Sequence, residues 1–238
     1  MARFYVDTAL RAGTSVLLPE DSAHHAAHVL RIRTGDEITL FDGRGGEYAA
    51  RVASIERLKV LADLLEHRAL ERESPLRMVL VQGVSAGERM DFTIRKAVEL
   101  GAAEIHPVLA ASSVARPKGG RAASRHAHWQ KIAIAACEQC GRNQIPKVHA
   151  MIAASDYRGG SGTRLLLSPA SELRFSQAVK DGGEFTIAAG PEAGFNASEA
   201  AAFLDAGFVP VRLGARVLRT ETAGIAALAA LSALKGDF

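Results

Sequence analysis

Over the first 70 residues, apolar and polar positions alternate in short stretches, which is typical of β-strands that bury one face. Turn-forming residues separate these stretches, most clearly the run Asp42–Gly46, whose glycines tolerate positive φ angles. Ser22 is predicted to cap a short helix that ends at Leu30. Several short strands with one helix favour a small β-barrel. The predicted strands are Phe4–Val6, Val16–Leu18, Glu37–Phe41, Glu47–Ile55 and Leu58–Leu65.

The pattern changes after the polar stretch Glu66–Pro75, which is predicted to be a linker. From Leu76 onward, short apolar runs of strand type alternate with stretches that carry apolar residues at helical spacing. This alternation predicts an α/β domain with a largely parallel sheet. The basic stretch Pro117–Arg125 is predicted to be a mobile loop. The predicted strands are Met78–Gln82, Ile105–Leu109, Arg164–Leu167, Phe185–Ala189 and Val209–Leu213, and the predicted helices include Gly87–Leu100, His126–Cys140 and Ser171–Lys180.

Capping residues mark the helices of the C-terminal region. Asn196, with Glu199 three residues later, is a predicted capping box. Gly207 is predicted to follow the last turn of the same helix. Thr220 or Thr222 is predicted to cap the final helix. The predicted order of this region is therefore strand, loop, helix, strand, loop and helix.

Two glycine-bearing loops follow the last two predicted strands. Gly190 and Pro191 end one strand, and Gly214 begins the loop after the next. Open α/β sheets bind ligands beyond the carboxyl ends of their strands, so these loops, expected on neighbouring strands, predict a ligand site. The chain has no GxGxxG motif and no GxxxxGK followed by Ser or Thr, which disfavours a nucleotide-dependent enzyme.

Composition changes this picture only slightly. The chain of 238 residues is 48% hydrophobic and 23% charged, as in soluble globular proteins. Its net charge of +3 is compatible with an RNA partner without requiring one. The first residues do not resemble a secretory leader, and no apolar run is long enough to span a bilayer. Together with only two cysteines, these features predict a cytoplasmic protein with no membrane partner.

The cysteines and histidines are candidates for metal or redox sites. Cys137 and Cys140 have C-x-x-C spacing but lie on an apolar stripe at the end of a predicted helix, whereas redox pairs use a helix N-terminus. Core packing is therefore predicted for both. His24 and His28 are one helical turn apart, but no Cys, Asp or Glu at the usual spacing completes a ligand set. No metal is predicted.

The sequences of the two C-terminal loops resemble one family. GPEAGFNASE and LGARVLRTETA are similar to the signature of the RsmE family of 16S rRNA uridine-N3 methyltransferases, which belongs to the SPOUT group. The resemblance extends over nearly the whole chain, through RFYV, HHAAHVLR, KAVELG and EQCGR. One departure is Ala193, which stands where the family has the first of two paired glycines. Because Gly194 remains, the alanine is expected to be tolerated.

The resemblance implies a fold, a cofactor and partners. Residues 1–70 would form a PUA-like RNA-binding barrel, and residues 76–238 a SPOUT methyltransferase domain with a C-terminal trefoil knot. The cofactor would be S-adenosylmethionine, and the partners 16S rRNA in the 30S subunit and a second copy of the chain bound through the knotted domain. The implied activity is methylation of N3 of a specific uridine. The alternatives are a SPOUT enzyme that methylates a ribose 2′-hydroxyl or another base, and a non-catalytic RNA-binding protein.

The resemblance also implies two sets of binding residues. Those implied to contact the cofactor are Leu167, Ser168, Gly190, Glu192, Gly194, Leu213, Gly214, Val217, Leu218 and Arg219. Those predicted to contact RNA are Arg3, His24, His25, Arg31, Arg33, Glu138, Gln139 and Arg142. For the histidines and the arginines that follow them, a solvated helix surface is the alternative.

Candidate catalytic residues follow from the chemistry of methyl transfer, which requires alignment of donor and acceptor and removal of the uracil N3 proton. Arg219 is predicted to stabilise charge on the uracil oxygens. Arg142 is predicted to reach a phosphate or the base. Either Glu192 or Glu221 can take the proton, although carboxylates near a helix N-terminus are also favoured by the helix dipole. The identity of the base stays open.

Overall fold

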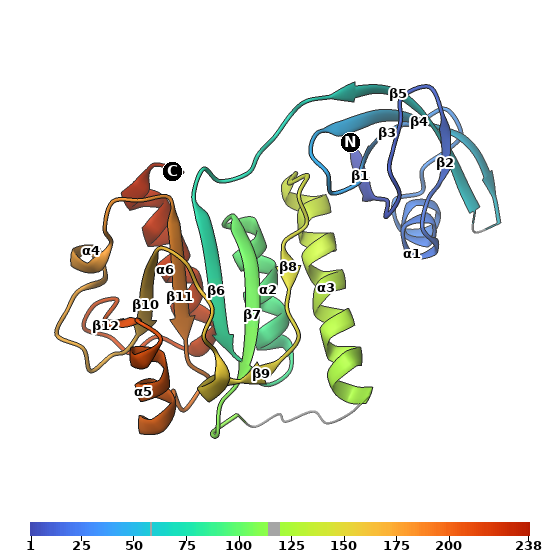
Figure 1. Ribbon diagram of the computed structural model, residues 1–238. Coiled ribbons are helices and arrows are strands. Elements are labelled where there is room, and N and C mark those ends of the chain that lie inside the picture. Colours follow the sequence, from blue (N-terminus) through green and yellow to red (C-terminus); the bar gives the residue numbers. More distant parts are fainter. Residues whose placement is uncertain (58, 114–119) are drawn as a thin grey trace. The chain divides into compact units, whose positions relative to one another are not determined.

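The structure, a computed structural model, describes residues 1–57, 59–113 and 120–238. The chain forms two compact units (Figure 1). The first comprises Met1–Glu73 and Cys137–Ile145, and the second comprises Ser74–Ala136 and Pro146–Phe238. The segment that carries EQCGR thus belongs to the first unit, although more than 60 residues of the second unit precede it in the chain.

A five-stranded sheet organises the first unit. The strand order is β1-β3-β4-β5-β2, with β1 parallel to β3 and the other pairs antiparallel. Alternate residues such as Phe4, Ile38, Leu40 and Val52 are buried in one cluster, as their alternation predicted. Closure of this sheet into a barrel stays a prediction. The strands are β1 (Ala2–Tyr5), β2 (Ser15–Leu17), β3 (Glu37–Phe41), β4 (Glu47–Glu56) and β5 (Lys59–Arg68).

Two predictions for this unit are wrong in detail. The start of the predicted linker Glu66–Pro75 belongs to β5, because the ladder with β4 continues as far as the pair Glu47 and Arg68. The predicted helix is α1 (Glu20–His24) followed by the π-helical η1 (His25–Val29), and Ser22 lies inside α1 instead of capping it. The N-cap residue is Pro19. The predicted strand start at position 58 lies outside the described residues.

The second unit contains a seven-stranded sheet in which every assigned pair is parallel, as predicted. The order is β12-β10-β11-β6-β7-β8, and β9 also pairs with β7. β10 therefore separates β11 from β12. The strands before the two glycine loops were expected to be direct neighbours, and this prediction is wrong. The strands are β6 (Arg77–Gly83), β7 (Ala102–Leu109), β8 (Lys147–Val148), β9 (Ile152–Ala153), β10 (Thr163–Leu167), β11 (Glu184–Ala189) and β12 (Val209–Val211).

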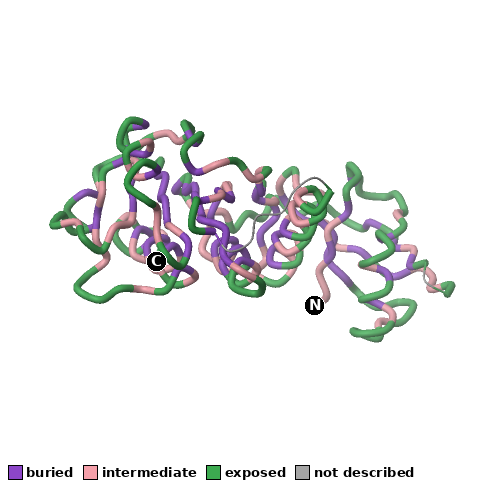
Figure 2. Tube along the Cα trace, turned by 90° about the horizontal axis from the view of Figure 1, so that it is seen from below, coloured by how far each residue is buried: buried purple, intermediate pink, exposed green. Residues whose placement is uncertain are grey.

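Helices cover both faces of this sheet. Leu80 and Val81 point to opposite faces because side chains alternate along β6. The face of Leu80 packs against α6 (Thr220–Lys235), which in turn contacts α2 (Glu88–Glu99). Val81 belongs to a buried cluster with Phe203 of α5 (Ala197–Asp205), which also contains Ala154 of the 3-10 helix η2 (Ala154–Asp156). Buried residues follow the strands, and the loops are mostly exposed (Figure 2).

Local capping signals in this unit have mixed outcomes. The Asn196 capping box is confirmed: Asn196 Oδ1 accepts the Glu199 N–H at 2.9 Å, and Glu199 Oε2 accepts the Asn196 N–H at 2.9 Å. Gly207 follows α5 with φ +83°, as predicted. The cap predicted for α6 is wrong, because its N-cap is Arg219, and Thr220 is the first helical residue.

Three further predictions need correction. The helix predicted over Ser171–Lys180 is a single turn, α4 (Phe175–Ala178), because the chain before it pairs with Arg212 beyond the end of β12. The predicted mobile loop overlaps α3 (Gly120–Cys140), whose first residues include 120–125, and the remainder of that prediction lies outside the described residues. The predicted strand Val209–Leu213 is shortened to β12, and Pro210 is accommodated because β12 is an edge strand.

Candidate active site

A cavity of about 680 Å³ lies in the second unit, at the carboxyl ends of β10, β11 and β12. This is the edge at which parallel sheets bind ligands, and the volume is within the usual range for small-molecule sites. The candidate base Glu221 lines the cavity. All ten residues implied to contact a cofactor line it as well: Leu167, Ser168, Gly190, Glu192, Gly194, Leu213, Gly214, Val217, Leu218 and Arg219. Tertiary structure therefore brings together three segments that are far apart in sequence.

The first loop of the cavity closes tightly on itself. The Gly194 N–H donates to the Pro191 carbonyl at 2.8 Å, and Gly194 has φ +71°, where glycine is favoured. Ala193 also lines the cavity but is not among the residues with positive φ. The alanine therefore occupies a position that does not require glycine, which agrees with the expectation that it is tolerated.

The second loop presents charged and apolar groups to the same cavity. Gly214, with φ +118°, begins a run of exposed residues that includes Val217, 79% exposed. Arg219 is exposed at the cavity wall, directly before α6, and Glu221 lies in the first turn of that helix. The loop thus places a guanidinium and a carboxylate close together in sequence at one wall of the cavity.

Glu192 is held by its neighbours. Its Oε1 accepts a hydrogen bond from Arg89 Nη1 at 2.8 Å and one from the Ala86 N–H at 3.4 Å. Burial raises the pKa of Glu192, but the hydrogen bonds from its own backbone, Ala86 and Arg89 outweigh burial and lower the pKa below its ordinary value. A carboxylate with a lowered pKa is a weaker base.

Two side-chain contacts of this site have no counterpart in the sequence predictions. Arg89 lines the cavity from the first turn of α2, a helix that carries no ligand-binding motif. Thr220, predicted only as a helix cap, donates its hydroxyl proton to the Gly190 carbonyl at 2.7 Å and so joins the first cavity loop to the start of α6. Neither contact has a local sequence signal, because each joins residues at least 30 positions apart.

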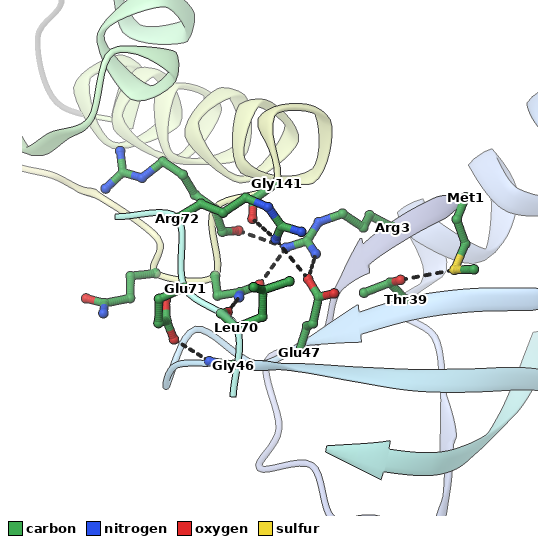
Figure 3. Close-up of polar contacts among 12 residues, drawn as sticks. Met1, Arg3, Thr39, Gly46, Glu47, Leu70, Glu71, Arg72 and Gly141 are labelled. Carbon is green, nitrogen blue, oxygen red and sulfur yellow. Dashed lines mark hydrogen bonds and ion pairs between the residues drawn. The ribbon is translucent and has the colours of Figure 1, made fainter. Parts of the chain in front are cut away.

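Three predicted RNA-contact residues, Arg3, Glu138 and Arg142, form hydrogen bonds with other residues of the first unit. Arg3 pairs with Glu47 and donates to the Arg142 carbonyl at 3.0 Å and to Asn143 Oδ1 at 2.6 Å, while Arg72 donates to the Gly141 carbonyl and Glu47 (Figure 3). These contacts hold the segment that follows α3 against the strands of the unit.

Arg142 and Glu138 are engaged in the same unit. The Arg142 side chain is buried, with its Nε donating to Glu73 Oε2 at 2.9 Å. Glu138 accepts the Tyr5 N–H at 2.9 Å, and burial raises its pKa while that hydrogen bond acts in the opposite direction. Arg142 does not line the cavity of the second unit.

The remaining predicted RNA residues are exposed. They are His24, His25, Arg31, Arg33 and Gln139. The rings of His24 and His28 lie 4.7 Å apart, as expected for residues one turn apart. Arg31, with φ +54°, is the second residue after η1 and follows the exposed residues Val29 and Leu30. Charged and apolar groups therefore share this stretch of surface.

The two cysteines are free thiols. Cys137 is fully buried, and burial raises the pKa of its thiol to about 12. A thiol with so high a pKa is unsuited to redox chemistry at neutral pH. The core-packing interpretation is confirmed for Cys137, while Cys140 is only half-buried.

Among residues 1–57, 59–113 and 120–238, one group has the composition of a metal site: Glu104, His106 and His149. Both histidine Nε2 atoms face Glu104 Oε2, at 3.2 and 2.7 Å. However, the two rings are stacked with planes 11° apart, so an ion in front of both nitrogens would lie outside both ring planes. Glu104 also pairs with Arg77. The arrangement suits hydrogen bonding better than metal coordination.

Comparison with known proteins agrees with this geometry. The RNA methyltransferase domain matches residues 72–232, and the RNA methyltransferase PUA domain matches residues 18–65. A Mycobacterium bovis protein named ribosomal RNA small subunit methyltransferase E is 32% identical, with 97% of this chain and 91% of the relative covered. A Buchnera aphidicola protein of the same name is 30% identical, with 99% and 94% covered. The chain belongs to the ribosomal RNA small subunit methyltransferase E family.

Solved structures that are similar to this chain support the fold. The Neisseria gonorrhoeae ribosomal RNA small subunit methyltransferase E, solved with S-adenosyl methionine, is 40% identical and superposes with a TM-score of 0.92 over 100% of this chain and 99% of its own. A Legionella pneumophila protein solved with SAM is 33% identical, with a TM-score of 0.94 over 98% and 97%. The predicted resemblance to the RsmE family is thereby confirmed, as are the RNA methyltransferase class and an α/β methyltransferase fold with a PUA-like domain.

Among the helices of the described part of the chain, none has both the length and the apolar character needed to cross a membrane.

Proposed function

We propose that this chain transfers a methyl group from S-adenosylmethionine to N3 of a uridine in 16S rRNA of the small ribosomal subunit. The observation that carries the proposal is the convergence of all ten implied cofactor residues, from the ends of β10, β11 and β12, on one cavity. The Neisseria gonorrhoeae relative, solved with S-adenosyl methionine, supports the choice of cofactor.

The residues of the cavity fit such a cofactor. Its wall contains apolar side chains, including Leu213 and Leu218, next to the backbone of Gly190 and Gly194. Apolar side chains can enclose an adenine ring, and glycines allow backbone N–H and C=O groups to approach a ligand closely. We further propose that the segment from β12 to α6 is threaded as the trefoil knot of a SPOUT domain, supported by the return of α6 against β6 and β11.

The chain's own residues would handle the acceptor base. When bound, S-adenosylmethionine supplies an electrophilic methyl group attached to a positively charged sulfonium sulfur. The thioether that remains is a good leaving group and needs no further activation. Arg219, exposed at the cavity wall, would stabilise negative charge on the uracil oxygens as the N3 proton leaves. Of the two candidate bases, Glu221 fits better, because Glu192 is paired with Arg89 and has a lowered pKa.

The first unit would bind the RNA. His24, His25, Arg31, Arg33 and Gln139 are exposed and able to contact phosphates or bases. Arg3, paired with Glu47 and Asn143, would serve this unit's architecture. Arg142 and Glu138 would have to leave Glu73 and the Tyr5 N–H, respectively, before they could contact the substrate.

The wider setting follows from the substrate. An enzyme of 30S subunits would act in the cytoplasm, where ribosomes reside. We also propose a homodimer through the second unit, as the family resemblance implies. We propose that no metal ion takes part, because the group Glu104, His106 and His149 is poorly arranged for coordination.

The test has two arms. Calorimetry with S-adenosylmethionine, in the presence and absence of a chelator, should show binding that does not depend on metal. Mass spectrometry of nucleosides from 16S rRNA should show 3-methyluridine formed when the protein is added to 30S subunits from a strain that lacks it. Appearance of a ribose 2′-O-methyl group, or of another methylated base, would replace the proposed acceptor. Binding of RNA without any methylation would indicate a non-catalytic protein.

A further inference from the structure

A buried chain of hydrogen bonds lies behind the cavity. Gln82, the penultimate residue of β6, is completely buried, and its Nε2 donates to Thr220 Oγ1 at 3.1 Å and to the Gly83 carbonyl at 3.2 Å. Thr220, 6% exposed, donates its hydroxyl proton to the Gly190 carbonyl at 2.7 Å. We call the chain Gln82–Thr220–Gly190 the relay. It joins the end of β6, the first cavity loop and the start of α6.

The three segments meet with no spare room. Gln82 lies opposite Ala189 in the parallel ladder of β6 and β11, one residue before Gly190. A Cβ atom on Gly83 would lie 2.4 Å from Pro191 Cδ, so β6 can approach the first loop only because residue 83 is glycine. On the other side, a Cβ atom on Gly224 of α6 would lie 3.0 Å from Gln82 Oε1. β6 therefore packs closely against the first loop at Gly83 and against α6 at Gln82.

Donor and acceptor chemistry determines the direction of the relay. The Thr220 hydroxyl has one proton, and it goes to Gly190, so Thr220 Oγ1 must accept from Gln82. The Gly83 carbonyl is also an acceptor, so both contacts require the NH2 group of the amide. Gln82 Oε1 has no hydrogen-bond partner among the described residues, and rotating the amide would place this oxygen against two acceptors. Glutamine suits this position, whereas a carboxylate does not.

We propose that Gln82 and Thr220 are positioning residues for the cofactor: the relay fixes the Gly190 carbonyl and thereby holds the two cavity loops in the arrangement that binds S-adenosylmethionine. This inference rests on the proposed function of the cavity. Gly190 of the first loop and Thr220, which begins α6 directly after the second loop, both line the cavity, and Gln82 lies behind them. If the relay is broken, the peptide after β11 is free to rotate, and the loop no longer presents its N–H and C=O groups in fixed directions.

The substitution Thr220→Val tests the relay with little change in shape, because it replaces a hydroxyl by a methyl group. Loss of the hydrogen bond should raise the dissociation constant for S-adenosylmethionine about five- to tenfold. Thr220→Ser keeps the hydroxyl and should bind within about twofold of the wild type. Thr186→Val is a matched control, because Thr186 is a buried threonine of β11 whose hydroxyl contacts the Ser161 carbonyl at 3.3 Å, outside the cavity wall.

Gln82→Glu gives a readout that a purely structural role would not produce. When ionised, the carboxylate of this variant can only accept hydrogen bonds, so the Thr220 hydroxyl would turn toward it and release the Gly190 carbonyl. A protonated carboxyl group can donate again, and burial raises its pKa. Cofactor affinity of Gln82→Glu should therefore be weak near about pH 8 and recover toward about pH 6, relative to the wild type at each pH.

The experiment is calorimetry of S-adenosylmethionine binding to the full chain and these variants, with thermal melting to check folding. Failure of the wild type to bind the cofactor would refute the proposed function. A wild type that binds, with Thr220→Val and Gln82→Glu binding equally well at every pH, would overturn the relay. If Thr220→Val fails to fold, the pH profile of Gln82→Glu decides alone. Recovery at low pH supports the relay, and a profile parallel to the wild type overturns it.

Discussion

Two carboxylates of the cavity are candidates for the base that removes the uracil N3 proton. Glu192 and Glu221 both line the cavity, but Glu192 accepts hydrogen bonds from Arg89 at 2.8 Å and from the Ala86 N–H. If Glu221 removes the uracil proton, Glu221→Gln should lower the single-turnover rate by about 10²- to 10⁴-fold, the usual contribution of a general base. Its affinity for S-adenosylmethionine should hardly change, because the amide has the shape of the carboxylate.

For Glu192→Gln the structure predicts a small effect on cofactor affinity and almost none on the methylation rate. The substitution removes an ion pair whose side chains are 46% (Arg89) and 30% (Glu192) exposed. Solvent screens such pairs, which contribute about 0–1 kcal/mol, so cofactor affinity should fall by at most about fivefold. The rate at saturating cofactor should stay near the wild-type value.

The assay is single-turnover methylation of 30S subunits at saturating cofactor, with the dissociation constant measured in parallel. Glu88→Gln is the matched control, because Glu88 lies in the first turn of α2 but not on the cavity wall. A hundredfold rate loss in Glu192→Gln together with an active Glu221→Gln would refute the assignment.

Three further outcomes are expected. Arg31→Ala with Arg33→Ala should flatten the log–log salt dependence of RNA binding by roughly two units at unchanged cofactor affinity; an unchanged slope would mean that neither residue contacts a phosphate. Because burial raises the pKa of Cys137 to about 12, an alkylating reagent at neutral pH should label Cys137 in urea but not in the native protein, and equal labelling would contradict the burial. Phe203→Ala, in the core between the sheet and α5, should lower the free energy of unfolding by about 3–5 kcal/mol in chemical denaturation, whereas the exposed Leu204→Ala should change it by less than about 0.5 kcal/mol; similar losses would refute this packing.

Interactions between residues close in sequence could be predicted from the sequence. The Asn196 capping box and Gly207 after α5 involve residues a few positions apart, and both are present as predicted. Apolar alternation identified the β-strands, because burial of one face follows from a period of two. The loop glycines of the cavity were also recognised, since their family signature is contiguous.

Contacts between distant segments were decided only by the tertiary structure. Thr220 has the side chain of a helix cap, yet it is the first residue of α6, and packing of α6 on β6 and β11 brings its hydroxyl into contact with Gly190 and Gln82. Arg3 and Arg142 resemble surface arginines in sequence, but Glu47 and Glu73 bind their guanidinium groups. Thr220 and Gly190 are 30 positions apart in the sequence, and the other pairs are at least 44 positions apart. No local sequence pattern encodes contacts over such separations.

The order of the strands was likewise beyond the sequence. Two glycine loops predicted a site at the ends of adjacent strands, but β10 lies between β11 and β12. Hydrophobic periodicity determines which residues face the core, but each of these short apolar strands could pair with several others. Their order depends on how the connecting helices pack against the whole sheet, so the site takes its third wall, Leu167 and Ser168, from a strand that tertiary packing selects.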